Sequence, residues 1–455
     1  MRIVKWQTAA TAVLVAAAVA LTSAQAPADV TLAVPGRTNA TPWIAADGRF
    51  VAVVWGATLD GRADVFVSTS DDAGATFGAP VRVNALAGDA RVSGEIPPRV
   101  ALHRAAGAVR PEVVVAWNAR GQGTGIKLAR SRDGGRTFGA ALVLQTPGAA
   151  GERGWHALTV DATGTAHVIW LDHRGLAEAR TSDAAARAKP AAAPATTPPA
   201  TAAQPQHGSG DHDGVAMAQK SRLYYARVGE TATVESALVA GVCYCCKTAL
   251  APTSRGVVAA WRHVYAGNMR DIAFTTIGAA PTEQPTRVSA DGWAINGCPD
   301  DGPAMAVGAG DRVHIVWPTV IPGAEPIGAV FYSAMTDGAK FGPRQRVPTL
   351  GAPKPSHPQV IDVNGRIVVA WDESREGLRR AGYVTGERGA DGAVRFGTPQ
   401  HLVSGDAPTS YPVLAVAGPD VVVALTAGPP AASVIRVVRL AAAPGATRVN
   451  PARAQ

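Results

Sequence analysis

The sequence predicts an all-β protein, a β-propeller of four-stranded antiparallel blades. Three observations predict it. A β-branched run that ends in Trp recurs along the chain, most successive copies lie 53 to 62 residues apart, and a turn motif of the form Ser-x-Asp-x-Gly-x-Thr-Phe occurs twice. A repeat period of this size, made of several short strands, is typical of propellers with one blade per repeat.

The Trp-ending runs mark the second strand of each predicted blade. Six copies end in Trp and a seventh ends in Leu, at residues 51–55, 113–117, 167–170, 257–261, 313–317, 367–371 and 421–425. A Pro-containing segment before each run supplies the first strand, and the third strand leads into the turn motif. This count predicts seven blades, with six as the alternative. Either residues 446–449 or residues 31–34 complete the last blade, because closure removes exposed sheet edges.

The two copies of the turn motif predict tight turns between the third and fourth strands. Asp and Ser side chains bond backbone amides within such turns, Gly supplies a backbone angle that other residues avoid, and Phe anchors the turn in the core. The motif residues are Ser70, Asp72, Gly74, Thr76 and Phe77, and then Ser131, Asp133, Gly135, Thr137 and Phe138. We therefore expect these residues to be structural.

Length and composition are those of a globular, exported protein. The chain has 455 residues, of which 47% are hydrophobic and 17% charged, with a formal net charge of +8. Residues 1–26 resemble a signal peptide, so we expect a periplasmic or secreted protein without a membrane span. Residues 29–450 form the predicted propeller, and the Ala- and Pro-rich residues 183–214 a flexible insertion in its third blade. Arg and Lys are scattered, which argues against nucleic-acid binding.

The topology of a blade predicts which face carries function. The first strand begins and the second strand ends on one face of the disc, whereas the turn motifs lie on the other. Titratable residues gather at the former positions, among them Glu95, Lys247, Asp301 and Asp372. Candidate ligand-binding residues on this face are Arg174, Arg262, Arg270, His263, His357 and Trp155.

All four cysteines fall on the same predicted face, and two interpretations remain open. In an exported protein an even number favours disulfides, with Cys298 joined to one member of the Cys243, Cys245 and Cys246 cluster. A second bond within that cluster would be tight. The alternative is a copper or zinc site on the four thiolates, helped by His263 or His357. No cofactor is required by the rest of the sequence.

The turn motifs and the repeat resemble the Asp boxes (BNR repeats) of the sialidase superfamily. This resemblance implies a propeller, usually of six blades, and exo-acting hydrolysis of glycosides by a Tyr nucleophile paired with Glu, an Asp acid/base and three Arg that grip a carboxylate. It assigns these catalytic roles to Tyr411, Glu373 and Asp172, and the grip to Arg174, Arg262 and Arg270. However, residues 39–42 lack the Arg that the family carries before Ile-Pro.

The first functional hypothesis is therefore a propeller that binds an anionic glycan or a soft metal at the axial mouth, without sialidase turnover. The alternatives are an exo-acting glycoside hydrolase of the exo-α-sialidase type and a scaffold for protein interactions. A small molecule or glycan is the expected ligand, and the sequence names no protein partner.

Overall fold

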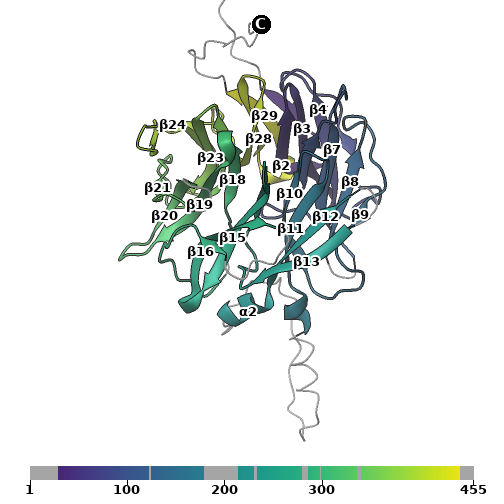
Figure 1. Ribbon diagram of the computed structural model, residues 1–455. Coiled ribbons are helices and arrows are strands. Elements are labelled where there is room, and N and C mark those ends of the chain that lie inside the picture. Colours follow the sequence, from purple (N-terminus) through teal and green to yellow (C-terminus); the bar gives the residue numbers. More distant parts are fainter. Residues whose placement is uncertain are drawn as a thin grey trace, which may run out of the picture.

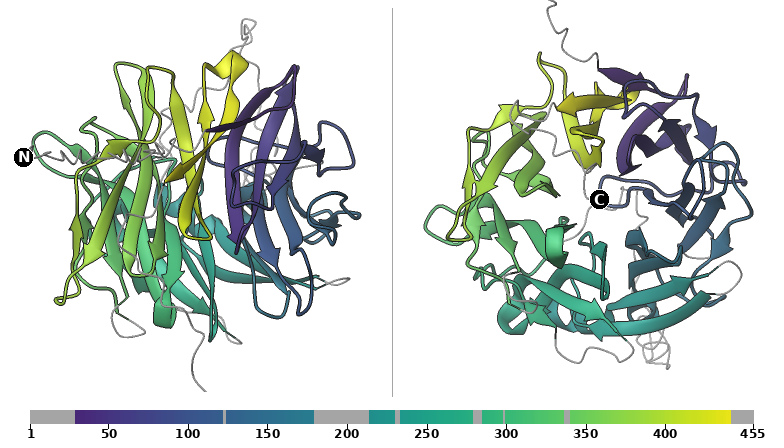
Figure 2. Two further views of the ribbon diagram at one scale, coloured as in Figure 1. Left: turned by 90° about the horizontal axis from the view of Figure 1, so that it is seen from above. Right: turned by 45° about the horizontal axis from the view of Figure 1, so that its top comes forward.

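Seven antiparallel sheets stand around a central axis in the computed structural model (Figures 1 and 2). The structure describes residues 29–121, 124–178, 214–229, 233–278, 285–297, 299–335 and 340–440. Each sheet has four strands, except that the sixth carries one short additional strand. The predicted propeller and its seven blades are confirmed, and the six blades that the family resemblance implied are wrong for this chain.

The strands of a blade follow one another in sequence order, and the first strands of neighbouring blades contact each other around the axis. The first three blades contain β2 (Thr38–Asp47), β3 (Phe50–Leu59), β4 (Arg62–Ser70) and β5 (Val81–Arg82); β6 (Arg99–His103), β7 (Glu112–Ala119), β8 (Gly125–Ser131) and β9 (Leu142–Val143); and β10 (Arg153–Val160), β11 (Ala166–Asp172), β12 (Arg222–Val228) and β13 (Thr233–Ala240). The next two contain β14 (Ala249–Thr253), β15 (Gly256–Tyr265), β16 (Met269–Ile277) and β17 (Thr286–Arg287); and β18 (Ala304–Gly308), β19 (Arg312–Ile321), β20 (Ile327–Ala334) and β21 (Gln345–Arg346). The last two contain β22 (Pro355–Val363), β23 (Arg366–Arg375), β24 (Leu378–Arg388), β25 (Val394–Phe396) and β26 (Gln400–His401); and β27 (Thr409–Ala417), β28 (Asp420–Ala427) and β29 (Val434–Leu440).

The ring is closed by the beginning of the described chain. Strand β1 (Val30–Leu32) pairs antiparallel with β29 and supplies the fourth strand of the seventh blade. Leu32 is buried there against Ile435 and Val437. Of the two predicted ways to complete this blade, residues 31–34 are therefore the correct one, and the alternative, residues 446–449, lies outside the described residues.

The Trp-ending runs form the second strands, as predicted, and their indoles are the centre of the core. All six Trp side chains at the ends of these runs are at most 1% exposed. They pack between neighbouring blades: Trp55, for example, lies in a cluster with residues of the first and seventh blades. Because every blade packs on two others in this way, the apolar faces of the sheets are covered around the whole ring.

The two Ser-x-Asp-x-Gly-x-Thr-Phe turns have the predicted internal hydrogen bonds. Ser70 Oγ accepts from the Gly74 amide at 2.9 Å, and Asp72 accepts from the amide and hydroxyl of Thr76 at 2.9 and 2.6 Å. The second copy repeats this pattern, with Asp133 accepting from Thr137. Although burial on its own raises the pKa of both Asp carboxyls, the hydrogen bonds from the Thr residues lower it to about 2.

Helix α2 (Gly214–Lys220) covers part of the rim below the third and fourth blades (Figure 1). Its Ala218 is buried against the cysteine cluster. Residues 183–213 of the predicted insertion and residues 1–26 of the predicted signal peptide lie outside the described residues. None of the described helices is long and apolar enough to span a bilayer.

Candidate functional site

Four innermost strands carry the same local irregularity where they begin. Strands β2, β10, β22 and β27 each contain a bulge, and one residue in each bulge has a left-handed backbone with φ between 53° and 56°. These residues are Thr41, Trp155, His357 and Tyr411. A left-handed backbone is unfavourable for such side chains, and bulges redirect side chains next to functional sites. The repeated strain marks this end of the axis as the candidate site.

Seven titratable side chains from five blades meet at this end, and we call them the axial group. They are Glu95, Lys247, Asp301, His357, Asp372, Arg379 and Tyr411. The sequence analysis placed most of these positions on the functional face. Arg379, at the start of a third strand, was missed because the face rule considered only first-strand starts and the residues directly after the second strand.

His357 is the centre of the axial group. Its Nδ1 contacts both carboxylate oxygens of Asp372 at 2.8 and 2.9 Å, and its Nε2 lies 2.9 Å from Glu95 Oε1. The backbone amide of His357 donates to Asp301 Oδ2 at 2.6 Å. The ring of Tyr411 packs on the imidazole with 4.4 Å between centroids. An imidazole held between two carboxylates is stabilised in its protonated form.

Asp372 and Asp301 each hold several groups in place. Asp372 also accepts hydrogen bonds from the Tyr411 amide at 2.6 Å and from the Arg379 guanidinium. Asp301 forms an ion pair with Lys247, whose Nζ lies 3.1 Å from Asp301 Oδ1. The same Nζ lies 3.9 Å from Glu95 Oε2. The loops that begin five blades are therefore tied together by alternating charges.

These contacts set the protonation states of the group. Burial on its own lowers the pKa of His357, but Asp372 and then Asp301 raise it to about 9 despite the opposing charge of Lys247. Burial on its own raises the pKa of Asp372, and His357 and Arg379 reverse this and lower it. Burial, Asp372 and Glu95 raise the pKa of the Tyr411 hydroxyl. At neutral pH His357 is therefore a cation and Tyr411 a neutral phenol.

Little space is left next to the axial group. A cavity of about 20 Å³ is lined by residues that include Lys247, His357 and Tyr411, and a deeper one of about 50 Å³ adjoins it. A water molecule needs roughly 15 Å³ by this measure, whereas sites that enclose drug-sized ligands occupy about 300 Å³ or more. The mouth therefore admits one small group of a ligand, while the rest of the ligand stays outside.

A larger hollow, of about 420 Å³, lies on the opposite face between the two Asp-containing turns. Its polar lining includes Ser70 and Asp72, which are already engaged in hydrogen bonds within their turn. Size alone favours this hollow, but the pKa of His357 is strongly shifted at the mouth, and shifted pKa values in a cleft are the better mark of a functional site.

Two of the three predicted catalytic residues hold the blades together. Glu373 accepts from the Trp371 indole at 2.7 Å and from the amides of Leu350 and Ala352. Asp172 likewise accepts from the Trp170 indole, at 3.1 Å. The predicted pairing of Glu373 with Tyr411 is therefore wrong. The residue before it, Asp372, contacts Tyr411 instead.

Asp172 is also paired with two arginines and is not available as an acid. Arg153 and Arg174 contact its carboxylate at 2.8 to 2.9 Å. Burial on its own raises the pKa of Asp172, but the hydrogen bond from Arg174 and the charge of Arg153 lower it. A carboxyl held in its anionic form in this way cannot donate a proton to a leaving group near neutral pH.

The three arginines predicted to grip a carboxylate are held by separate partners. Arg174 bonds Asp172 and also Glu235, on an outer strand, at 2.7 Å. Arg262 is fully buried and donates to the carbonyl oxygens of Asp301, Arg270 and Pro318. Arg270 donates to Ile295 O at 3.2 Å. The three guanidinium groups therefore bond different acceptors and do not form a joint grip, and among the described residues Arg270 Nη1 has no hydrogen-bond partner.

Of the remaining predicted ligand-binding residues, His357 and Trp155 lie at strained axial positions. Trp155 packs against the cysteine cluster and its ring lies 5.4 Å from that of His173. His263 instead contacts the Trp261 indole and packs on Tyr265 at 4.7 Å. Burial lowers the pKa of His263 to about 4, so it is neutral in its blade. Trp155 thus stays a candidate, whereas His263 is engaged by its own strand.

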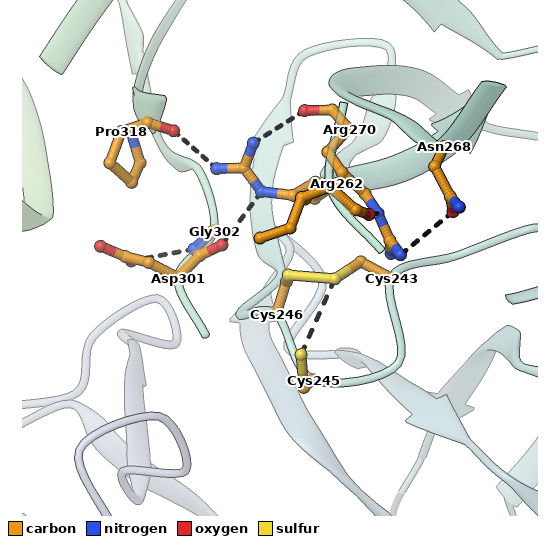
Figure 3. The surroundings of a disulfide bond; sticks show 10 residues. Cys243, Cys245, Cys246, Arg262, Asn268, Arg270, Asp301, Gly302 and Pro318 are labelled. Atoms are coloured by element: carbon orange, nitrogen blue, oxygen red, sulfur yellow. Dashed lines mark hydrogen bonds between the residues drawn. A yellow bond between two sulfur atoms is a disulfide. The ribbon is translucent and has the colours of Figure 1, made fainter. Parts of the chain in front are cut away.

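The cysteine cluster contains a disulfide between Cys243 and Cys246 (Figure 3). Cys245 Sγ lies 3.9 Å from Cys243 Sγ, and the three sulfur atoms lie within 4.8 Å of one another. Within the described part of the chain, no cysteine is a free thiol. The bond that we expected to be disfavoured by its tight spacing is therefore present. The expected bond to Cys298 stays a prediction, because Cys298 lies outside the described residues.

Comparisons with known proteins yield no family assignment. No family model and no curated protein matches the chain. Among solved structures, a protein of unknown function from Dyadobacter fermentans DSM 18053 is 10% identical over 91% of this chain and 98% of its own, with a TM-score of 0.46. An α-L-arabinanase from Penicillium chrysogenum is 12% identical over 91% and 99%, with a TM-score of 0.45. Trypanosoma rangeli sialidase is 10% identical over 89% and 55%, with a TM-score of 0.42. We take nothing about activity from these low similarities.

Proposed function

We propose that this protein is an exported propeller that binds the charged end of an anionic glycan at its axial mouth, without hydrolysing sialosides by the sialidase mechanism. The observation that supports this best is the axial group itself. Buried titratable side chains brought together from five blades, on strained backbone, are unusual outside functional sites.

The exposed parts of the axial group are suited to such a ligand. The Arg379 side chain is 36% exposed, so part of its planar fork faces the mouth and matches a carboxylate. The Glu95 side chain is 18% exposed, and its buried Oε2 has no hydrogen-bond partner among the described residues, so a small movement of this side chain would let Oε2 accept from a sugar hydroxyl. Tyr411 lines the same small cavity. A ligand with adjacent carboxylate and hydroxyl groups therefore fits these three residues.

The sialidase mechanism has little support at this mouth. A Tyr nucleophile needs a carboxylate that accepts its proton. No described carboxylate accepts a hydrogen bond from the Tyr411 hydroxyl. Burial and the charge of Asp372 raise the pKa of this hydroxyl. The hydroxyl therefore stays protonated, which favours binding over nucleophilic attack.

Calorimetric titration with N-acetylneuraminate, glucuronate and glucose tests the proposal, together with a fluorogenic sialoside assay. We expect both acidic sugars to bind, glucose to bind at least tenfold more weakly, and no sialoside turnover. Turnover that disappears in Tyr411→Phe would instead establish the hydrolase alternative. Binding of none of the three sugars would favour the protein scaffold.

The second candidate ligand is a soft metal at the cysteine cluster. It is favoured by the three sulfur atoms that lie within 4.8 Å of one another. Thiolates in this arrangement suit copper(I) or zinc once all three cysteines are reduced. Metal analysis and a thiol count, on protein purified with and without reductant, test this candidate. Metal bound only to the reduced protein supports it, and no metal in either preparation contradicts it.

A further inference from the structure

A partly enclosed cavity lies in the central channel, deeper than the axial mouth. Its volume is about 50 Å³, which is several times the roughly 15 Å³ that one water molecule needs. Its polar lining consists of Arg99, Lys247, Thr248 and Gln359, and Trp43 forms one wall. The rest of its lining is apolar: Ala157, Leu158, Ala249, Leu250, Pro303, Ala304 and Met305. A cavity of this size, with both polar and apolar lining, has room for a small polar species.

Arg99 is a buried cation with too few acceptors. The residue is 2% exposed, and its guanidinium carbon lies 3.6 Å from the centre of the Trp43 ring. Its Nε donates to His156 O at 3.0 Å. Within the described residues, neither of its two terminal amino groups has a hydrogen-bond acceptor. A buried guanidinium of this kind is costly unless an anion or another acceptor completes it.

The charges around the cavity do not balance. The carboxylates of the axial group are Glu95, Asp301 and Asp372. Its cations are Lys247, Arg379 and protonated His357, and these six charges cancel. Arg99 adds one positive charge. The carboxylate that acts on Arg99 and raises its pKa against burial is Glu95, which is already bonded to His357. One positive charge is therefore left over beside the cavity.

We propose that this cavity binds one small monovalent anion, such as chloride, between Arg99 and Lys247. The single excess charge matches a monovalent ion. The apolar side chains of the lining offer no donors for the additional oxygen atoms of sulfate or phosphate, and a volume of about 50 Å³ excludes a sugar acid. The site is separate from the glycan site proposed above, although Lys247 borders both.

Thermal unfolding in sodium chloride and in sodium propanesulfonate, at equal ionic strength, tests this site. An ion that binds only the folded state raises the melting temperature, whereas propanesulfonate is too large to enter and has neither the carboxylate nor the hydroxyl group expected of a ligand at the mouth. We expect the melting temperature to rise with chloride until it saturates, and to stay flat in propanesulfonate. Arg99→Met should abolish the chloride response. Arg104→Met should retain it, because Arg104 forms an exposed pair with Asp47 on the opposite face.

Anomalous diffraction from crystals grown in bromide keeps the proposal testable if Arg99→Met does not fold. The predicted result is a bromide peak between the Arg99 guanidinium and Lys247 Nζ in the wild-type protein. Bromide peaks on the outer surface alone, or equal melting temperatures in chloride and propanesulfonate, would overturn the proposal.

Discussion

Asp372 and Glu373 are neighbours on β23, yet they have different roles because successive side chains of a strand face opposite sides. Asp372 contacts His357 at the axis, whereas Glu373 caps the Trp371 indole. Asp172 stands at the same place, two residues after Trp170. In the third, fourth and sixth blades the residue two positions after the Trp therefore bonds the indole, whereas Asn39 and Asp291 do so in the first and fifth. In the sixth blade the residue directly after the Trp faces the axis. The sequence alone does not show which of these two side chains faces the axis, and Glu373 was therefore chosen as the partner of Tyr411.

His357 should make stability depend on pH. Its pKa is raised from 6.5 to about 9 in the folded protein, so its stabilising effect is complete below pH 6.5 and is lost as the pH rises through about 9. We expect the free energy of unfolding to fall by up to about 3 kcal/mol over this range relative to His357→Gln. Denaturant unfolding of both proteins from pH 6 to pH 10 measures it. A constant difference between them would contradict the shifted pKa.

Asp372 should be among the most costly polar residues to replace. Asp372→Asn leaves His357 and Arg379 without their buried counter-charge, which typically costs about 3 to 5 kcal/mol. Asp406→Asn is the matched control, because Asp406 is fully exposed and 3.7 Å from its partner Arg380, and it should change stability by less than about 0.5 kcal/mol. Chemical denaturation measures both. Equal effects of the two substitutions would refute a buried role for Asp372.

At the scale of elements, turns have a structural role on one face of the ring, and bulges position side chains at the axis on the other face. The Asp72 and Asp133 turns saturate their own hydrogen bonds and fasten third strands to fourth strands. The bulges of β2, β10, β22 and β27 instead turn single side chains toward the axis. The turns were predictable because their motif is local. The bulges were not, because their strained backbone depends on contacts between blades.

Asp72→Ala should destabilise the protein without affecting the mouth. It removes the hydrogen bonds from Thr76 and Ser70, at a cost of about 1 to 3 kcal/mol. Because the pKa of Asp72 is lowered to about 2, this difference should be present above about pH 4 and shrink as the pH falls toward 2. Denaturant unfolding measures the loss of stability, and calorimetry on the same sample measures sugar binding. Loss of sugar binding in this variant would mean that the sugar binds on the face of the turns and not at the axial mouth.

At the scale of the whole molecule, the ring depends on a contact between the two ends of the described chain. Sequence periodicity predicted seven blades, because each blade repeats the same apolar second strand. It left open which segment closes the last blade, since both candidates are short β-branched runs. The structure resolves this through the pairing of β1 with β29. It also shows why the sequence could not assemble the axial group: its members lie on strands and loops of five different blades.

Leu32→Ala should weaken ring closure. Leu32 is 5% exposed and packs on the seventh blade, so its truncation should cost about 2 to 5 kcal/mol. Leu59→Ala is the control, because Leu59 is 47% exposed, and its cost should be below about 1 kcal/mol. Differential scanning calorimetry compares the two. A harmless Leu32→Ala would mean that β1 does not close the ring.

The central claim is that the axial mouth is the ligand site. Its most direct test is the affinity of Tyr411→Phe and Tyr383→Phe for whichever of N-acetylneuraminate and glucuronate binds the wild-type protein more tightly, measured by calorimetry. Tyr411 lies on His357 at the mouth, whereas Tyr383 is bonded to exposed Gln400 on the sixth blade. Loss of the Tyr411 hydroxyl should weaken binding about tenfold, while Tyr383→Phe should leave it unchanged. Unchanged binding in Tyr411→Phe would mean that the ligand does not bind at the axial mouth.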